Sequence, residues 1–290
     1  MARFDIAVIG SGPGGYVAAL RAAQLGKAVC VVERDALGGV CLNRGCIPTK
    51  ALAHSADVFE EAKEGEKIGV CVGDLTLDFG KMMAAKDAVV RKLSGGVGFL
   101  LKRAKVTVFA GEGRLVDRKT IVVTLNEGGE ETLEAEKIIL ATGSEPARPS
   151  WLPFDSDRLM TSDEALQLAE MPASVLILGG GYIGCEFACI LSQLGCQVTV
   201  VEMLDHLLPL MDADVGAEIT KSLKRRKVKV HTGTKLESLE ADDAGVVATL
   251  EGGKTIEAEK ALICIGRRML SDGLGLEEAG VAVENGAIQI

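Results

Sequence analysis

Several features that mark other classes of protein are missing from this 290-residue chain. No apolar run reaches the roughly 20 residues that a membrane-spanning helix needs. An excess of positive charge is also missing, because 41 acidic residues stand against 32 lysines and arginines and give a formal net charge of −9. That balance disfavours nucleic acid or an anionic membrane surface as the main partner. No address motif is visible, so we expect a cytoplasmic protein.

Two segments look like exceptions to these absences. The first residues, MARFDIAVIGSGPGG, superficially resemble a signal peptide, but Asp5 interrupts the apolar stretch and a glycine motif follows at once. We therefore predict a first β-strand there. The basic run KRRK at Lys224–Lys227 is best explained as the end of a helix before a strand, where cations complement the helix dipole.

Eight cysteines are present, but a disulfide scaffold belongs to small secreted domains, which this chain does not resemble. Cys185 and Cys189 share a helix face without a second ligand pair or a nearby histidine, so no metal site is predicted. Cys41 and Cys46 lie in GGVCLNRGCIPTKAL, and by themselves they fit packing residues, metal ligands or a working disulfide. The other six are expected to be buried small hydrophobic residues: Cys30, Cys71, Cys185, Cys189, Cys196 and Cys264.

The residues that are plentiful indicate an α/β protein. Apolar residues make up 48 % of the chain, glycine occurs 35 times and aromatic residues are only 3 %. This composition suits Val/Ile/Ala-rich strands joined by tight glycine turns. At about 100–200 residues per domain, the length predicts two domains.

One sequence pattern occurs twice, at residues 4–33 and 174–202. Each copy runs from an apolar strand through G-x-G-x-x-G, a helix and a glycine stop to a second apolar strand and a glutamate. The first glycine and the glutamate are 23 positions apart in both copies, Gly10 to Glu33 and Gly179 to Glu202. A single G-x-G-x-x-G is weak evidence, but with every other part of a dinucleotide-binding unit in order it becomes strong.

The glycines of this motif have separable roles. The first permits a tight turn, the second lets a pyrophosphate approach the backbone, and the third lets the helix pack on the sheet. The phosphate then meets the free N–H groups and the positive end of the helix dipole. In the two copies these positions are Gly10, Gly12 and Gly15, and Gly179, Gly181 and Gly184.

The acid that closes each copy indicates the nucleotide. Glu33 and Glu202 are placed to accept hydrogen bonds from ribose hydroxyls, and an acid there repels a 2′-phosphate, so NADP is disfavoured. Pro13 suits the first helical turn, where no N–H is needed. The alternative is an α/β domain whose glycines merely make turns.

The segments between the motifs complete two modules. KIILATGSEP (137–146) and KALICIGRRM (260–269) both end an apolar strand in a glycine turn. The stretch from Val40 reads as helical, and Phe79–Arg103 is long and amphipathic. Hairpin turns are expected at NEGGEE and inside VVATLEGGKTIEAEK, and residues 281–290 read as strand, turn and strand. Further strands of the first module are expected at Lys105–Phe109, Arg114–Val116 and Thr120–Leu125.

The chain is similar to the pyridine nucleotide–disulfide oxidoreductases. The similarity rests on VIGSGPGG, GGVCLNRGCIPTKAL, ILATGSEP, GGGYIGCE, VEML and CIGRR, which occur in the family's order over nearly the whole chain. It implies two Rossmann-like FAD/NAD(P)-binding modules of three-layer ββα character, with the NAD module inserted in the FAD module. We place the FAD domain at 1–145, the NAD domain at 146–268 and a return into the first domain at 269–290, with the Pro-rich 145–153 as the boundary.

The resemblance implies a reaction and the residues that carry it. The segment is most similar to members that oxidise dihydrolipoamide with NAD⁺, serving the lipoyl domains of an acyltransferase in 2-oxo acid dehydrogenase complexes. Cys41 then exchanges with the substrate and Cys46 lies against the flavin, both within a redox disulfide. Lys50 lies near the reactive nitrogen of the flavin and Glu186 pairs with it across the two modules.

The same resemblance implies the cofactor contacts. For FAD they are Gly10, Gly12, Pro13, Gly14, Gly15, Glu33, Arg34, Gly38, Gly39, Val40, Cys41, Lys50, Gly113, Thr142, Gly143 and Ser144. For NAD they are Gly179, Gly180, Gly181, Tyr182, Ile183, Gly184, Glu202, Leu236, Gly266 and Arg267.

The sequence departs from the family at its end and at one position. The family continues into a dimerisation domain with a catalytic His–Glu pair, and His54, His206 and His231 lie in no such motif. We therefore expect an incomplete enzyme that holds NAD better than FAD and turns over poorly. A related NAD(P)H-dependent disulfide or mercuric reductase and a non-catalytic NAD(H)-binding fragment are the alternatives. Arg44 stands where many members have an apolar residue, and we expect it to face solvent.

Overall fold

The computed structural model describes residues 1–290, which divide into two compact units that are described separately below. Unit 1 comprises Met1–Ile47, Ala88–Glu145 and Arg267–Ile290. Unit 2 comprises Pro48–Asp87 and Pro146–Gly266.

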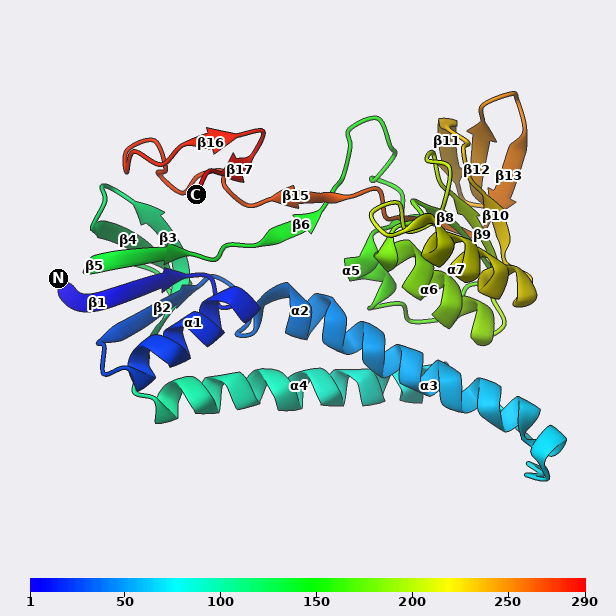
Figure 1. The fold of residues 1–290 in the computed structure, drawn as a ribbon, viewed down its shortest axis with the longest axis horizontal. Helices are drawn as coiled ribbons and strands as arrows, with labels where there is room; N and C mark the ends of the chain where they lie inside the picture. The colour runs from blue at the N-terminus through cyan, green and yellow to red at the C-terminus, as the bar shows by residue number, and fades with distance from the viewer. The chain divides into compact units, whose positions relative to one another are not determined.

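Unit 1 is built on five strands that close on one another. Parallel β1 lies between β2 and β5, β3 continues the parallel pairing from β2, and antiparallel β4 joins β3 to β5. The long strands β3 and β5 (Figure 1) belong to both parts, because β3 runs from parallel pairing with β2 into antiparallel pairing with β4, and β5 runs from antiparallel pairing with β4 into parallel pairing with β1. The strands are β1 (Ala2–Ile9), β2 (Val29–Glu33), β3 (Thr107–Leu115), β4 (Thr120–Leu125) and β5 (Glu130–Leu140).

Strand β3 corrects one sequence prediction. The sequence suggested two short runs separated by AGEG, whereas β3 is continuous through both glycines. A Cβ on Gly111 would lie 2.3 Å from the carbonyl oxygen of Thr124 on β4, so this glycine lets two strands approach. A glycine inside a strand was therefore mistaken for a strand end.

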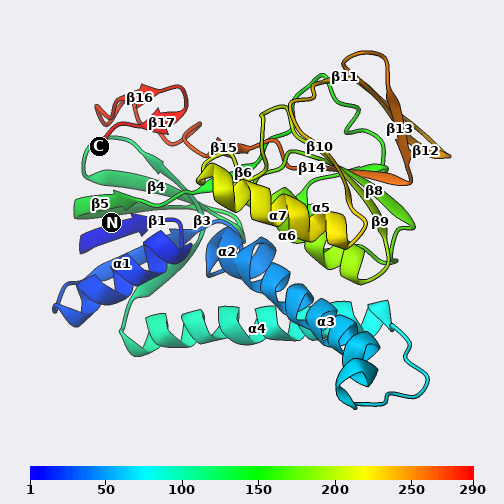
Figure 2. The ribbon, with the colours of Figure 1, turned by 45° about the vertical axis from the view of Figure 1, so that its right-hand side comes forward.

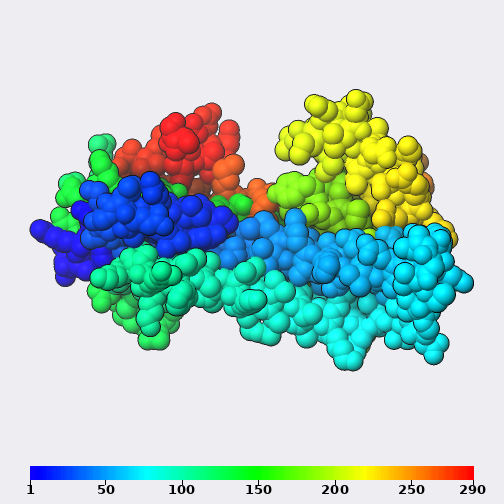
Figure 3. Space-filling view, turned by 60° about the horizontal axis from the view of Figure 1, so that its bottom comes forward, coloured from blue at the N-terminus to red at the C-terminus, as the bar shows by residue number.

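Helices cover one face of the unit 1 sheet. Alternation along β1 separates the layers, because Val8 packs with helices α1 and α4 while Ala7 and Ile9 point into the strand-lined core. Figure 3 shows α1 (blue) beside the C-terminal half of α4 (teal) on the outer surface of this unit. These helices are α1 (Pro13–Gln24), the short α2 (Gly39–Arg44) and α4 (Phe79–Arg103), of which residues from Ala88 belong to unit 1.

The last residues return to unit 1. Leu274 and Leu276 join the strand-lined core, and Leu115 N–H donates to the carbonyl of Leu274 at 2.8 Å. The predicted strand, turn and strand at the end is a two-stranded hairpin. The strands of this region are β6 (Ser144–Pro146), which pairs with β15 (Arg267–Met269), and β16 (Val283–Glu284), which pairs with β17 (Ala287–Ile288).

Unit 2 has three layers, which are helices, a parallel sheet and a small antiparallel sheet. Leu176 and Leu178 of β8 pack against an antiparallel three-stranded sheet, and Val175 and Ile177 pack against helices on the other face. Figure 2 shows α6 and α7 side by side on that face. Two such units confirm the predicted α/β fold class.

The elements of unit 2 are as follows. The parallel sheet has the order β10 (Lys229–His231), β9 (Gln197–Val201), β8 (Ser174–Leu178), β14 (Lys260–Ile263) and β7 (Leu159–Met160). The antiparallel sheet is β11 (Leu236–Asp242), β12 (Gly245–Leu250) and β13 (Thr255–Ala258). The helices are α3 (Cys46–Glu64, from Pro48), the 3₁₀ turn η1 (Gly65–Ile68), α5 (Ser162–Ala165), α6 (Tyr182–Gln193) and α7 (Ala213–Arg225). The basic run thus ends α7, as predicted.

Helix α3 packs with unit 2, although the sequence boundaries place it in the first domain. Leu52 and Ala56 of α3 and Met82 and Met83 of α4 belong to the same buried cluster as Phe187 of α6. Apolar side chains four residues apart lie on one helix face, and α3 turns that face to the α6 side of this unit. No helix of the chain is long and apolar enough to cross a membrane.

Candidate dinucleotide and redox site

The acid of each module is held by its own glycine loop. In unit 1, Glu33 Oε2 accepts from Ser11 N–H at 2.8 Å and Oε1 from Asp35 N–H at 2.9 Å. In unit 2, Glu202 Oε2 accepts from Gly180 N–H at 2.6 Å and Oε1 from Leu204 N–H at 2.8 Å. The two copies therefore fix their carboxylates by the same pair of contacts. Glu33 Oε2 accepts a second hydrogen bond, from Ser11 Oγ at 2.6 Å, so Oε1 is the oxygen of Glu33 with a lone pair left for a ribose hydroxyl, whereas both oxygens of Glu202 keep one.

Two of the three motif glycines are required by packing. A Cβ on Gly10 would lie 2.2 Å from the carbonyl oxygen of Ala141, and one on Gly179 would lie 2.4 Å from that of Cys264. Both also have positive φ, +97° and +100°. The third glycines pack on the first, since a Cβ on Gly184 would lie 2.1 Å from Gly179 O. These positions are glycine because backbone lies against backbone.

The middle glycine of each loop has no such neighbour. Nothing lies within 4 Å of a Cβ on Gly181, and a Cβ on Gly12 meets only Gly39 Cα at 4.0 Å. Gly12 and Gly181 are also the N-caps of α1 and α6, and neither helix has a side-chain cap. At both loops there is open space beside helix N–H groups that no side chain caps, and this arrangement fits a dinucleotide pyrophosphate. Gly14, whose Cβ would meet nothing, and Pro13 at the first turn complete the loop of unit 1.

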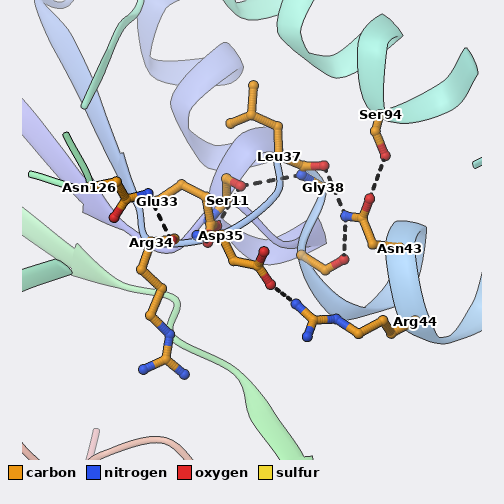
Figure 4. A network of polar contacts seen from close by, with 11 residues as sticks. Ser11, Glu33, Arg34, Asp35, Leu37, Gly38, Asn43, Arg44, Ser94 and Asn126 are labelled. Atoms are coloured by element: carbon orange, nitrogen blue, oxygen red, sulfur yellow. Dashed lines mark hydrogen bonds and ion pairs between the residues drawn. The ribbon is translucent and has the colours of Figure 1, made fainter. Parts of the chain in front are cut away.

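A second loop lies against the first glycine loop of unit 1. Gly38 and Gly39 have φ of +95° and +60°, and a Cβ on Gly39 would come within 2.6 Å of Gly12 Cα. Gly38 N–H donates to Ser11 O at 3.1 Å and to Ser11 Oγ at 3.2 Å (Figure 4). The loop from Glu33 to Gly39 therefore packs against the first glycine turn at Ser11 and Gly12, and α2 begins where the loop ends.

The cysteine pair follows this loop. Cys41 is half-buried in α2, and the exposed Cys46 begins α3. A Cβ on Gly45 would lie 3.4 Å from Cys41 Cα, so this C-cap residue packs closely on the last turn of α2 just before Cys46. Both are thiols in this structure, and their disulfide remains a prediction.

The other cysteines have a different chemistry. Burial raises the pKa of Cys30, Cys185 and Cys196 to about 12 in each case. They are packing residues, as expected, because a protonated thiol in an apolar core is a poor nucleophile. Cys71 differs from its prediction, because it is exposed in the irregular segment after η1. No group of three or more histidines, cysteines and carboxylates is placed to hold a metal ion.

Lys50 and Glu186 form the ion pair that the resemblance implies, although within one unit and not across the two modules. Lys50 Nζ lies 2.5 Å from Glu186 Oε1, and their side chains are 61 % and 37 % exposed. Both belong to unit 2, so the pair joins α3 to α6 within one unit. Lys50 lies one helical turn after Cys46 on α3.

The remaining predicted FAD contacts have varied surroundings. Gly113 faces the side chains of Val32 and Ile121 inside unit 1. Thr142 Oγ1 donates to Leu270 O at 2.7 Å, and exposed Gly143 has φ of +73°. Arg34 is exposed and lies 3.4 Å from Glu112, and Val40 is half-buried in α2.

The remaining predicted NAD contacts lie at the ends of unit 2 elements, with one exception. Tyr182 and Ile183 open α6, Leu236 opens β11, and Gly266 has φ of +132° beside open space. Arg267 belongs to unit 1, where its guanidinium donates to Ser144 Oγ at 2.8 Å and Ser144 O at 2.6 Å. Its side chain therefore holds a predicted FAD residue in place.

Several residues that organise the site were missed by the sequence analysis. Ser11, Asp35, Asn43 and Ser94 form the polar network of Figure 4. Arg44, expected to face solvent, has a side chain that is 41 % exposed and pairs with the exposed Asp35, a partner that the sequence did not indicate. The position of Ser11 between two motif glycines was the available signal, while the partners of the other residues are distant in sequence.

Comparisons with known proteins agree with this geometry. The profile of the family "Pyridine nucleotide-disulphide oxidoreductase" matches residues 4–290. A dihydrolipoyl dehydrogenase of Chlorobaculum tepidum is 44 % identical over 99 % of this chain and 62 % of its own length. One of Bacillus subtilis is 41 % identical over 99 % of this chain and 63 % of its own length. The chain thus spans less than two thirds of these relatives.

Solved structures that resemble this chain indicate the same family. LpdA of Mycobacterium tuberculosis superposes with a TM-score of 0.90 at 29 % identity, covering 99 % of this chain and 63 % of its own. The HOCl-induced flavoprotein disulfide reductase RclA of Escherichia coli, as a Cu(II) complex, gives 0.87 at 28 % identity and covers 100 % of this chain and 63 % of its own. With sequence profile, relatives and fold in agreement, this chain belongs to the pyridine nucleotide-disulphide oxidoreductase family.

Proposed function

We propose that this chain carries the dinucleotide and dithiol sites of a dihydrolipoyl dehydrogenase, which oxidises dihydrolipoamide and reduces NAD⁺. The observation that carries the proposal is the continuity of the first module. The loop that lies on Gly12 leads directly into α2, so the Cys41–Cys46 pair borders the first dinucleotide site. The relatives that match nearly the whole chain are named as dihydrolipoyl dehydrogenases.

The residues of each module have distinct tasks in this reaction. The loop of unit 1 would hold FAD through the N–H groups after Gly12 and the carboxylate of Glu33, and the loop of unit 2 would hold NAD in the same way. Bound FAD would supply the electron acceptor that links the dithiol to NAD⁺. The chain's own step is thiol–disulfide exchange, in which the thiols of the substrate reduce the Cys41–Cys46 disulfide and are themselves joined.

Glu202 supports NAD over NADP. Its carboxylate is almost fully buried and is fixed by two backbone N–H groups at the end of β9. A 2′-phosphate at that point would meet a fixed negative charge in a site of low exposure. The proposal therefore includes NAD specificity, and it disfavours the alternative of an NADPH-dependent disulfide or mercuric reductase.

The proposal extends to the setting of the whole enzyme. By family resemblance it acts as a cytoplasmic homodimer on lipoyl domains of an acyltransferase component, with no nucleic acid or membrane partner. A non-catalytic NAD(H)-binding protein is the other alternative. Gel filtration and flavin content separate it from the enzyme, since the enzyme requires bound flavin.

An anaerobic titration tests the proposal. The purified protein is titrated with dihydrolipoamide while its visible spectrum is recorded, and C41S and C46S are compared. Flavin bands with a growing long-wavelength charge-transfer band are expected for the wild type. C41S has no disulfide to reduce, so its charge-transfer band should be present before dihydrolipoamide is added, and C46S should show none. A flavoprotein that dihydrolipoamide does not reduce would contradict the proposal, as would faster reduction by NADPH than by NADH.

A further inference from the structure

Asn43 lies between the two cysteines and joins three segments of unit 1. Its Nδ2 donates to Leu37 O at 3.1 Å and to Gly39 O at 2.9 Å. Its Oδ1 accepts from Ser94 Oγ of α4 at 2.8 Å. Figure 4 shows the amide placed between the turn that carries Leu37 and the helix that carries Ser94.

The chemistry of these partners fixes the orientation of the amide. Two carbonyl oxygens can only accept, so the NH₂ group must face them, and the Ser94 hydroxyl can then donate to the oxygen. Both amide hydrogens and one oxygen lone pair are therefore used by a half-buried side chain. These three hydrogen bonds hold the Asn43 side chain in one rotamer more firmly than an exposed ion pair would.

This contact restrains the segment that has to close a disulfide. The Cys41–Cys46 segment contains the end of α2 and Gly45, a residue type with high backbone freedom when it is not restrained. Asn43 ties the middle of the segment to residues 37–39, and Gly38 is itself tied to Ser11. The dithiol therefore has fewer conformations to lose when its sulfur atoms join.

We propose that Asn43, oriented by Ser94, is a positioning residue that presets the Cys41–Cys46 segment for disulfide closure and thereby lowers the reduction potential of the pair. The inference rests on the proposed function, because it needs the pair to be redox-active. Oxidation by glutathione disulfide defines the reaction: the two thiols form one S–S bond, the S–S bond of glutathione disulfide breaks, and both protons go to the two glutathione thiolates.

A purely structural role for Asn43 makes a different prediction. In that case its loss lowers the melting temperature but leaves the thiol–disulfide equilibrium of the folded protein unchanged. Asn126 offers a matched control, because its Nδ2 donates to Arg34 O at 3.1 Å on the same segment, far from the cysteines in sequence. Asn126 is drawn on the opposite side of that segment in Figure 4.

The experiment compares the wild type with N43L, S94A and N126L. Each protein is equilibrated anaerobically in glutathione buffers of graded ratio, trapped with an alkylating agent, and the Cys41–Cys46 peptide is quantified by mass spectrometry. We expect the equilibrium constant for disulfide formation to fall about tenfold in N43L, which is about 30 mV for this two-electron couple. S94A should shift it in the same direction by less, and N126L should leave it unchanged.

Each outcome bears on the inference. An unshifted constant in N43L, or an equal shift in N126L, overturns it. Where N43L does not fold, S94A decides, and an unchanged constant there overturns it as well. A wild-type protein that forms no Cys41–Cys46 disulfide in any buffer overturns the proposed function together with the inference, whereas a normal wild type with unshifted variants overturns the inference alone.

Discussion

Lys50 of α3 and Glu186 of α6 form an ion pair of 2.5 Å at the surface of unit 2, 136 residues apart in sequence. Because the lysine side chain is 61 % exposed, water screens the pair and its contribution to stability is expected to be small, about 0–1 kcal/mol. The pair therefore adds little stability, although it joins two helices one turn after Cys46. We infer that its position serves function more than stability.

The first prediction separates these two roles. Lys50→Met should change the free energy of unfolding by less than about 1 kcal/mol, since the ion pair with Glu186 that it removes is exposed. The same change should lower the rate at which dihydrolipoamide reduces the flavin, because the cation one helical turn after Cys46 is lost. Urea denaturation and stopped-flow reduction measure the two effects. A large loss of stability with normal reduction would show that the pair is structural.

The second prediction uses two glycines of one loop. Gly184→Ala should destabilise unit 2 by about 1–3 kcal/mol, because its Cβ would lie 2.1 Å from a backbone oxygen that cannot move cheaply. Gly181→Ala has open space and should keep the fold, while its methyl group obstructs the approach of a pyrophosphate and weakens NAD binding. Thermal melting and calorimetric titration with NADH measure both variants. Equal NADH affinity in Gly181→Ala and the wild type would show that the pyrophosphate of NAD does not bind beside Gly181.

The glycine motifs also show what the sequence could and could not reveal. Spacing alone identified both loops and both acids, because turn, helix and strand follow one another within about 30 residues. The spacing assigned Gly10 to a tight turn. The structure adds that the backbone of Ala141, far along the chain, lies too close to Gly10 for a side chain to fit. Contacts of that kind depend on which distant strand is the neighbour, and local patterns do not carry that information.

Helix α3 is the clearest case of tertiary contacts deciding an assignment. Its sequence follows the first dinucleotide motif directly, which placed it in the first domain. Its partners lie beyond residue 146, because Gln193 Nε2 donates to Asp57 at 2.7 Å and to Glu60 at 2.8 Å. The amphipathic pattern predicts that the helix has a buried face, but it does not say which unit covers that face.

The third prediction concerns alkaline pH. Burial raises the pKa of the Cys30 thiol from 9.0 to about 12, so the folded state holds a proton that the unfolded state releases above pH 9. Stability is therefore fully present below pH 9 and is lost as pH rises toward 12, by up to about 1.4 kcal/mol per pH unit for one thiol. Denaturation of Cys30→Ala between pH 9 and 11 should show a shallower loss than the wild type. Cys71→Ala, which removes an exposed thiol, is the control and should keep the wild-type slope.

The fourth prediction concerns the position that departs from the family pattern. Arg44 pairs with Asp35, so its charge is already opposed by a carboxylate. Arg44→Leu should therefore leave the pH profile of Cys41 alkylation unchanged and cost less than about 1 kcal/mol of stability. Peptide-resolved alkylation across pH measures the profile, with Arg34→Leu as a control on the neighbouring segment. A profile displaced toward higher pH in Arg44→Leu alone would mean that the guanidinium favours the thiolate.

The fifth prediction tests the polar contacts that hold α3 to its unit. Burial raises the pKa of Glu60, but hydrogen bonds from Gln193 and Arg226 outweigh it and hold the pKa below its ordinary value of 4.5. A depressed pKa means that this stability is present above the unfolded pKa and is lost as pH falls through the folded one. Glu60→Gln should thus destabilise the protein by about 1–3 kcal/mol at neutral pH, as expected for a charged hydrogen bond.

The acid limit provides the decisive comparison for Glu60. Below the folded pKa the wild type also carries a neutral side chain at this position, so Glu60→Gln and wild type should converge in stability as pH falls. Glu64→Gln is the matched control on the same helix, because Glu64 pairs only with exposed Lys67 three residues away and should change stability by a few tenths of a kcal/mol at any pH. A constant difference between Glu60→Gln and wild type from neutral to acid pH would show that shape rather than charge holds α3 in place.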